Sequence, residues 1–209
     1  MNLIKGCFIG FSLLVGASAN AAIINFEFGN GNIGNVLSDL RTFSSGGYTL
    51  TVKAFQRNDP DSRVRATVEQ WKSGLGVDSD ADGQNFRVDN EVGLLEQLEF
   101  TLSSAGDPGA KFTFVEIFFG GQYSSQLKAG DTAQVRFGYP HPAVFISGPT
   151  NSHKMSLVGS SNRITVQSGN NSVDTGFRVQ GLAIDVPEPT SLAILGLGLL
   201  GLGARRFIK

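Results

Sequence analysis

The chain is nearly free of cysteine. Its one cysteine, Cys7, lies in the first 21 residues, a stretch that we expect to be removed from the mature protein. The folded protein then has no disulfide and no thiol nucleophile. Residues 22–186 are numerous enough to bury a sizeable apolar core without cross-links, as one domain.

No catalytic motif is recognisable. The sequence has no Gly-x-Ser-x-Gly elbow, no Walker loop and no His-Glu-x-x-His pair. Its two histidines, His141 and His153, stand apart in turn-rich segments and are typical of surface loops. Carboxylates such as Glu96 and Glu116 could serve a glycosidase or a lyase, but that chemistry depends on a spatial separation that sequence spacing does not give. The missing motifs therefore favour a non-catalytic protein.

A basic excess is also missing. Residues 22–186 contain 13 Lys and Arg against 17 Asp and Glu, a net charge of −4. Proteins that bind nucleic acid or anionic membranes through their charge are usually basic. We therefore expect no nucleic-acid partner.

Residues 1–21 have the features of a secretory signal peptide. Lys5 is the only charge in the first 26 residues, residues 8–15 are apolar, and small residues follow them. This arrangement predicts cleavage after Ala21, with a cut after Ala19 as the alternative. We therefore expect the chain to be exported.

Residues 186–209 combine three elements: a Pro-Glu-Pro stretch, an uncharged apolar segment at 190–204 and a basic end. The prolines keep the residues before them extended and accessible. The apolar segment is shorter than the roughly 20 residues of a full helical span, and its glycines are tolerated in lipid. The basic end favours the cytoplasmic side. We expect a hydrophobic sorting helix that holds the chain transiently at the inner membrane.

This three-part ending resembles the C-terminal signal of PEP-CTERM proteins. The resemblance implies processing by an exosortase-type membrane protease in Gram-negative bacteria that make exopolysaccharide, followed by delivery to the cell surface or the extracellular matrix. The sorting residues that it implies are Pro187, Glu188, Pro189, Arg205 and Arg206. The family is united by its sorting signal, so the resemblance implies no particular activity.

The same family often has an aromatic residue, a Gly-Leu-Gly-Val stretch, an acidic turn and an Asp-Asn pair before a strand. Here Trp71, residues 74–77, residues 78–82 and Asp89-Asn90 follow that order. This internal likeness is looser than that of the C-terminal signal.

Residues 22–185 have the pattern of strands almost throughout. Short runs alternate apolar and polar residues with period two, and clusters of Gly, Asn, Asp and Ser separate them. In residues 48–55 this alternation places Tyr48, Leu50, Val52 and Ala54 on the core face. The predicted strands are 23–28, 48–55, 64–71, 96–102, 112–119, 133–137, 143–147, 155–158, 163–167 and 177–186; residues 34–42 are the only helix-like stretch. This pattern predicts an all-β fold, a single antiparallel β-sandwich of the jelly-roll type.

Residues 78–89 contain a pattern typical of a calcium loop. Aspartates at alternate positions before a glycine direct several hard oxygens at one centre, as Ca²⁺ requires. Residues 78–99 contain seven acidic residues and one basic residue. Without a counter-ion the seven carboxylates would repel one another. The alternative is a solvated acidic turn, because Asp and Gly are favoured in turns for their backbone geometry alone. The candidate ligands are Asp78, Asp80, Asp82, Gln84 and Asp89, the last standing where an EF-hand has glutamate.

Trp71, Tyr123 and Tyr139 are candidate glycan contacts if their rings are exposed, although a lone tryptophan in a strand is more often part of the core. Together these features predict a non-catalytic exported surface or matrix protein that binds exopolysaccharide with a calcium-stiffened loop. The alternative is a small polysaccharide-active enzyme, a lyase or glycoside hydrolase, on a jelly-roll scaffold.

Overall fold

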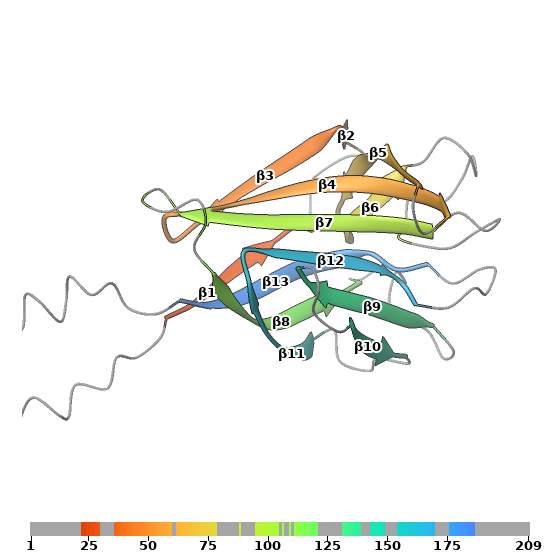
Figure 1. The fold of residues 1–209 in the computed structure, drawn as a ribbon. Coiled ribbons are helices and arrows are strands. Elements are labelled where there is room, and N and C mark those ends of the chain that lie inside the picture. The colour runs from red at the N-terminus through yellow and green to blue at the C-terminus, as the bar shows by residue number, and fades with distance from the viewer. Residues whose placement is uncertain are drawn as a thin grey trace, which may run out of the picture. The chain divides into compact units, whose positions relative to one another are not determined.

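A computed structural model of the chain describes residues 22–29, 36–59, 62–78, 88, 95–104, 106, 109, 111–120, 131–138, 143–148, 154–169 and 176–186. The chain divides into two units, one of residues Ile23–Asp185 and one of the two ends, Met1–Ala22 with Val186–Lys209. Within the described residues every regular element is a strand (Figure 1). The strands are β1 (Ala22–Glu27), β2 (Val36–Ser38), β3 (Leu40–Ser45), β4 (Tyr48–Asp59), β5 (Ser62–Trp71), β6 (Gly74–Asp78), β7 (Leu95–Ser104), β8 (Phe112–Phe119), β9 (Thr132–Phe137), β10 (Ala143–Ser147), β11 (Lys154–Ser161), β12 (Arg163–Ser168) and β13 (Val179–Val186).

The strands form one antiparallel sheet. Its order is β10-β9-β12-β7-β4-β5-β6-β13-β8-β11, while β1 pairs with β13, β2 with β5 and β3 with β4. Strand β5 links the two halves, because it pairs with β4 up to Ala66 and with β6 from Thr67 onward. The order differs from the sequence order, so neighbours in the sheet often come from distant parts of the chain.

The sheet curls over one of its faces. Tyr48 on β4 and Phe112 on β8 have ring centroids 5.4 Å apart, although β5, β6 and β13 lie between their strands in the sheet order. Phe28 and Phe100 pack in the same way, at 5.7 Å. The all-β, antiparallel prediction is confirmed. A sandwich of two separate sheets, or a jelly roll, is not confirmed, because the strands follow one continuous path.

The core lies on the inner face of this curl. Leu50, Val52 and Ala54 of β4 are fully buried, as their alternation in the sequence predicts. In β7, β9 and β12 the alternate apolar residues are buried likewise, and several polar residues between them are also buried. Each fully buried Leu or Phe contributes about 1.5–3 kcal/mol relative to exposure. Because these side chains point inward, the side chains of the residues next to them along each strand point outward.

Two local predictions were wrong. The helix-like stretch was residues 34–42, and its described residues, 36–42, are not helical. They contribute to β2 and β3, since their backbones pair with β5 and β4 and this pairing overrides a weak local preference. Residues 74–78, which are absent from the predicted strands, form β6. Gly74 begins that strand at φ 120°, where a Cβ would lie 2.5 Å from the carbonyl oxygen of Val179, so only glycine fits there.

Candidate functional site

The predicted calcium segment has two described residues, Asp78 and Val88, and each pairs with a neighbouring backbone. Asp78 ends β6 opposite Thr67, and Val88 pairs with Phe177 through a backbone hydrogen bond of 2.8 Å and a return bond of 3.3 Å. Across the described residues no group of three or more His, Cys, Asp or Glu could hold a metal ion. The other candidate ligands lie outside the described residues: Asp80, Asp82, Gln84 and Asp89. Calcium binding stays a prediction.

A buried ion pair lies beside the start of this segment. The guanidinium of Arg178 donates to the Glu69 carboxylate, and both residues are almost completely buried. Arg178 also donates to the backbone carbonyl of Gly74 at 3.5 Å. Burial raises the pKa of Glu69, Arg178 opposes that rise, and the charge of Asp78 adds to it. The pair joins β5 to the residues that precede β13.

Trp71 lies against the same pair. The Arg178 guanidinium carbon lies 5.6 Å from the centroid of the Trp71 ring, and Lys72 Nζ lies 5.0 Å from it. Two cations therefore lie close to this one ring. The ring is half-buried, and a sugar that stacks on it would share the ring with these cations. The two other aromatic candidates, Tyr123 and Tyr139, lie outside the described residues.

The predicted processing residues also lie outside the described residues. These are Ala19, Ala21, Pro187, Glu188, Pro189, Arg205 and Arg206. The part of the chain that the structure describes contains no helix with the length and apolarity that crossing a membrane requires.

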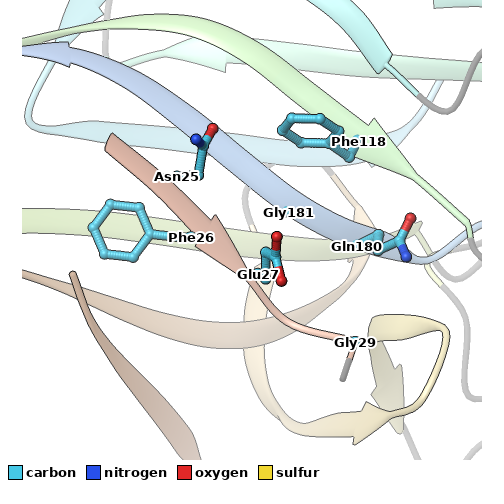
Figure 2. A pocket seen from close by; sticks show the side chains of 7 residues that line it. All are labelled: Asn25, Phe26, Glu27, Gly29, Phe118, Gln180 and Gly181. Carbon is cyan, nitrogen blue, oxygen red and sulfur yellow. The ribbon is translucent and has the colours of Figure 1, made fainter. Parts of the chain in front are cut away.

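A small cleft opens over Gly181 on β13 (Figure 2). Its volume is about 250 Å³. Gly181 has no room for a side chain, because a Cβ there would lie 2.6 Å from the Phe26 carbonyl oxygen. The cleft combines an aromatic wall with amide and carboxylate groups, the mixture that orients small polar ligands. Besides Gly181 its lining residues are Asn25, Phe26, Glu27, Gly29, Phe118 and Gln180.

A group of polar side chains lies on the outer face of the half of the sheet that contains β4, β7, β12, β9 and β10. These residues alternate with fully buried ones such as Leu98, Val135 and Val166, so they point away from the core. We call this surface the arginine–glutamine face. It consists of Lys53 and Phe55 on β4, Arg63 and Arg65 on β5, Gln97 and Glu99 on β7, Gln134 and Arg136 on β9, Phe145 on β10, and Arg163 and Gln167 on β12.

A row of amides crosses this face between two phenylalanines. The register places Phe55 opposite Gln97, Gln97 opposite Gln167, Gln167 opposite Gln134 and Gln134 opposite Phe145. Gln167 Nε2 donates to Gln134 Oε1, and the three glutamines are only 5–9% exposed. Phe145, by contrast, is 59% exposed. The amides therefore form a tight floor with an aromatic ring standing at one end.

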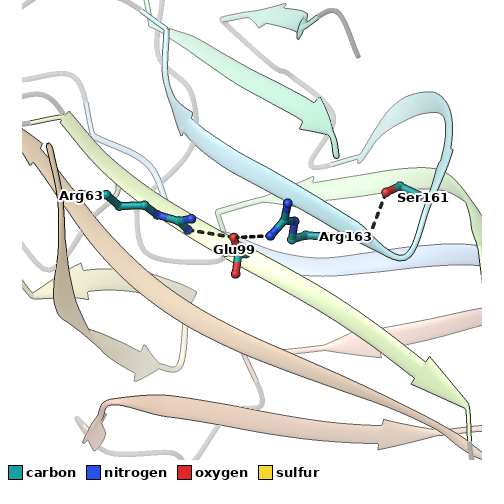
Figure 3. Close-up of polar contacts among 4 residues, drawn as sticks. All are labelled: Arg63, Glu99, Ser161 and Arg163. Atoms are coloured by element: carbon teal, nitrogen blue, oxygen red, sulfur yellow. Dashed lines mark hydrogen bonds and ion pairs between the residues drawn. The ribbon is translucent and has the colours of Figure 1, made fainter. Parts of the chain in front are cut away.

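Charged side chains lie beside the amide row. Figure 3 shows Glu99 between two arginines, with its Oε2 2.8 Å from Arg63 Nη2 and 3.6 Å from Arg163 Nη1. The Arg63 guanidinium also covers the Phe55 ring at 3.4 Å, and the Arg163 backbone N–H donates to Ser161 Oγ. One carboxylate thus holds two guanidinium groups in place on the surface.

Arg136 is oriented by the amide floor instead. Its Nε and Nη2 donate to Gln134 Oε1 at 3.3 and 3.2 Å, and the residue is exposed. Among the described residues no carboxylate pairs with it. Arg136 therefore presents its remaining N–H groups to the surroundings in a fixed orientation.

Sequence reasoning did not identify this face. Alternation in each strand indicated which residues point outward, but nothing in the sequence indicated that β5, β4, β7, β12, β9 and β10 are consecutive in the sheet. The remaining signal was the sign of the charges, since several arginines occupy outward positions of predicted strands.

The comparison with protein-family models matches residues 185–206 to the PEP-CTERM protein-sorting motif. The chain carries a PEP-CTERM sorting signal. This signal implies export, processing by an exosortase, which is a membrane protease, and transient anchoring in the membrane before surface display. No curated protein and no solved structure matches the chain.

The strand that follows the predicted leader lies next to the strand that leads into the sorting motif. Strand β1 pairs with β13, the Phe28 N–H donates to the Gln180 carbonyl oxygen at 2.8 Å, and Gly181 packs against the Phe26 carbonyl. The matched motif begins at Asp185, within β13. The domain is therefore connected to both ends of the chain through neighbouring strands.

Proposed function

We propose that this PEP-CTERM protein is a non-catalytic surface or matrix protein that binds exopolysaccharide through the arginine–glutamine face. The observation that supports this proposal is the row of amides between Phe55 and Phe145, with guanidinium groups beside it. The exposed guanidinium groups can hydrogen-bond sugar hydroxyls, and an exposed ring stacks on a sugar face. The buried amides support these groups, since Gln134 orients Arg136. A face built from extended strands suits an extended ligand.

The arrangement of carboxylates favours binding over cleavage. Glycoside hydrolysis needs two carboxyl groups on either side of the scissile bond, one of them protonated. Glu99 is the one carboxylate among the described residues of the arginine–glutamine face, and both of its described ion-pair partners are arginines. The calcium part of the proposal is that Ca²⁺ stiffens residues 78–89, in which Val88 pairs with Phe177.

The test uses the full-length chain in a mild neutral detergent and a panel of bacterial exopolysaccharides. We expect retention of the protein on at least one polysaccharide, with no new reducing or unsaturated ends. Phe145→Ala should weaken retention, and Lys111→Gln, which changes an exposed residue outside the face, should not. New chain ends would establish the enzyme instead, and absence of retention across the panel would refute the binding function.

A further inference from the structure

We infer that the arginine–glutamine face selects a carboxylated polysaccharide, one rich in uronic acid, over a neutral glycan. This inference rests on the proposed function and adds the chemical class of the ligand. Five cations lie on the face (Lys53, Arg63, Arg65, Arg136 and Arg163) against one acid, Glu99.

The charge of this face is opposite to that of the domain. Residues 22–186 carry a net charge of −4, yet the arginine–glutamine face holds five of their 13 cations. Like charges on one surface repel one another, and a complementary anion relieves that repulsion. Glu99 accounts for contacts with Arg63 and Arg163, which leaves Lys53, Arg65 and Arg136 with no carboxylate partner among the described residues.

Two of these cations are arginines held in set positions at opposite ends of the amide row. Arg136 is oriented by Gln134, and Arg65 Nη2 donates to the backbone carbonyl of Asp39 at 3.3 Å. Their strands, β9 and β5, are four steps apart in the sheet, or about 19 Å at ~4.8 Å a step. A guanidinium binds a carboxylate through two parallel hydrogen bonds. Two guanidinium groups at this distance match a polymer with carboxylates several sugars apart.

Nucleic acid fits the same face less well. Duplex DNA carries about one charge per 1.7 Å, and its binding needs a dense basic surface. Five cations on a domain of net charge −4 do not supply that density. A uronic-acid polymer carries at most one charge per sugar, so its charge is spaced more like that of the arginines.

The experiment compares alginate with carboxyl-reduced alginate, in which the same chain has lost its charges. Binding of the full-length protein in neutral detergent is measured by affinity electrophoresis at low and high salt, with duplex DNA as a third ligand. We expect alginate to bind about tenfold more tightly than its reduced form at low salt, and high salt to remove most of the difference. Arg136→Gln and Arg65→Gln should each weaken alginate binding severalfold. Arg136→Lys should recover part of the loss, and Lys111→Gln should have no effect.

The outcomes separate the two proposals. Equal binding of native and reduced alginate would overturn the inference and leave the glycan-binding function standing. Binding of neither, nor of any glycan in the panel, would overturn both. Stronger binding of DNA than of alginate at equal salt would overturn the inference in favour of a nucleic-acid ligand. Because the alginate comparison uses the wild-type chain, it does not depend on any variant folding.

Discussion

Removing one member of the buried Glu69–Arg178 pair should destabilise the domain strongly. Glu69 is 2% exposed and Arg178 5%, so Arg178→Met leaves a carboxylate in the interior without its partner. Breaking a buried ion pair from one side costs about 3–5 kcal/mol. A typical domain has about 5–15 kcal/mol in total, so this loss would be visible in any unfolding curve.

The double variant should recover most of that loss. Glu69→Leu together with Arg178→Met replaces both charges with apolar groups, and such replacements are often neutral or stabilising by about 1–4 kcal/mol. The sum of the two single-variant costs should therefore exceed the cost of the double variant. The difference between that sum and the double-variant cost is the coupling energy. Lys111→Met, a change at an exposed site, should stay within about 0.5 kcal/mol of the wild type.

The pH dependence of unfolding gives an independent readout. Burial raises the pKa of Glu69 in the folded state, so the folded protein holds this proton more tightly than the unfolded chain does. The contribution of Glu69 is then most favourable below the ordinary glutamate pKa, and it declines as the pH rises through the raised value. Arg178 opposes the rise, so Arg178→Met should extend this decline to higher pH.

The assay is urea unfolding of the full-length chain in neutral detergent across pH 4–8. The fluorescence of Trp71 serves as the probe, because its ring contacts Arg178 and it is the one tryptophan of the chain. If Arg178→Met lowers the free energy of unfolding by less than about 1 kcal/mol, or if the variant follows the wild-type pH profile, Glu69 and Arg178 do not form a buried ion pair.

Three further predictions concern the strand pattern, calcium and processing. Leu50→Asp should unfold the domain because Leu50 is fully buried, while Thr51→Asp on the outer side should cost little; equal effects in thermal unfolding would contradict the register. Calcium at ~100 times its dissociation constant should stabilise the protein by about 2.7 kcal/mol, at millimolar concentrations and more than Mg²⁺, and Asp80→Asn should weaken this gain. A melting curve that is unchanged by calcium and by chelator would refute the metal site. Intact-mass analysis of the protein released by its native host should show loss of residues 1–21 and of the segment after the Pro-Glu-Pro stretch; a mature protein that keeps Arg205 and Arg206 would contradict exosortase processing.

Strand positions and faces could be predicted from the sequence where alternation was regular. Residues 48–55 alternate cleanly, and Leu50, Val52 and Ala54 are indeed buried. Strand β6 was missed because Gly74 and Gly76 break the strand pattern. In the fold the Val179 backbone leaves no room for a side chain at Gly74, and Gly76 pairs with Glu69 of β5. Strands β2 and β3 were missed because their stability comes from pairing with β5 and β4, which local sequence does not encode.

The arginine–glutamine face could not be predicted for a related reason. Gln97, Gln134 and Gln167 are far apart in the sequence and meet only because β12 lies between β7 and β9. The sorting signal, by contrast, is contiguous and is defined by local residue order, so the sequence alone predicts it. The family comparison confirms that prediction.

Binding of the wild-type protein to the exopolysaccharide of its native host tests the central claim most directly. The comparison is with a variant that combines Arg65→Gln, Arg136→Gln and Phe145→Ala, three exposed residues on separate strands, and with Lys111→Gln as the control. We predict that the wild type and Lys111→Gln are retained equally and that the triple variant binds about 100-fold more weakly with unchanged unfolding. Equal retention of all three proteins would show that the arginine–glutamine face is not the binding surface.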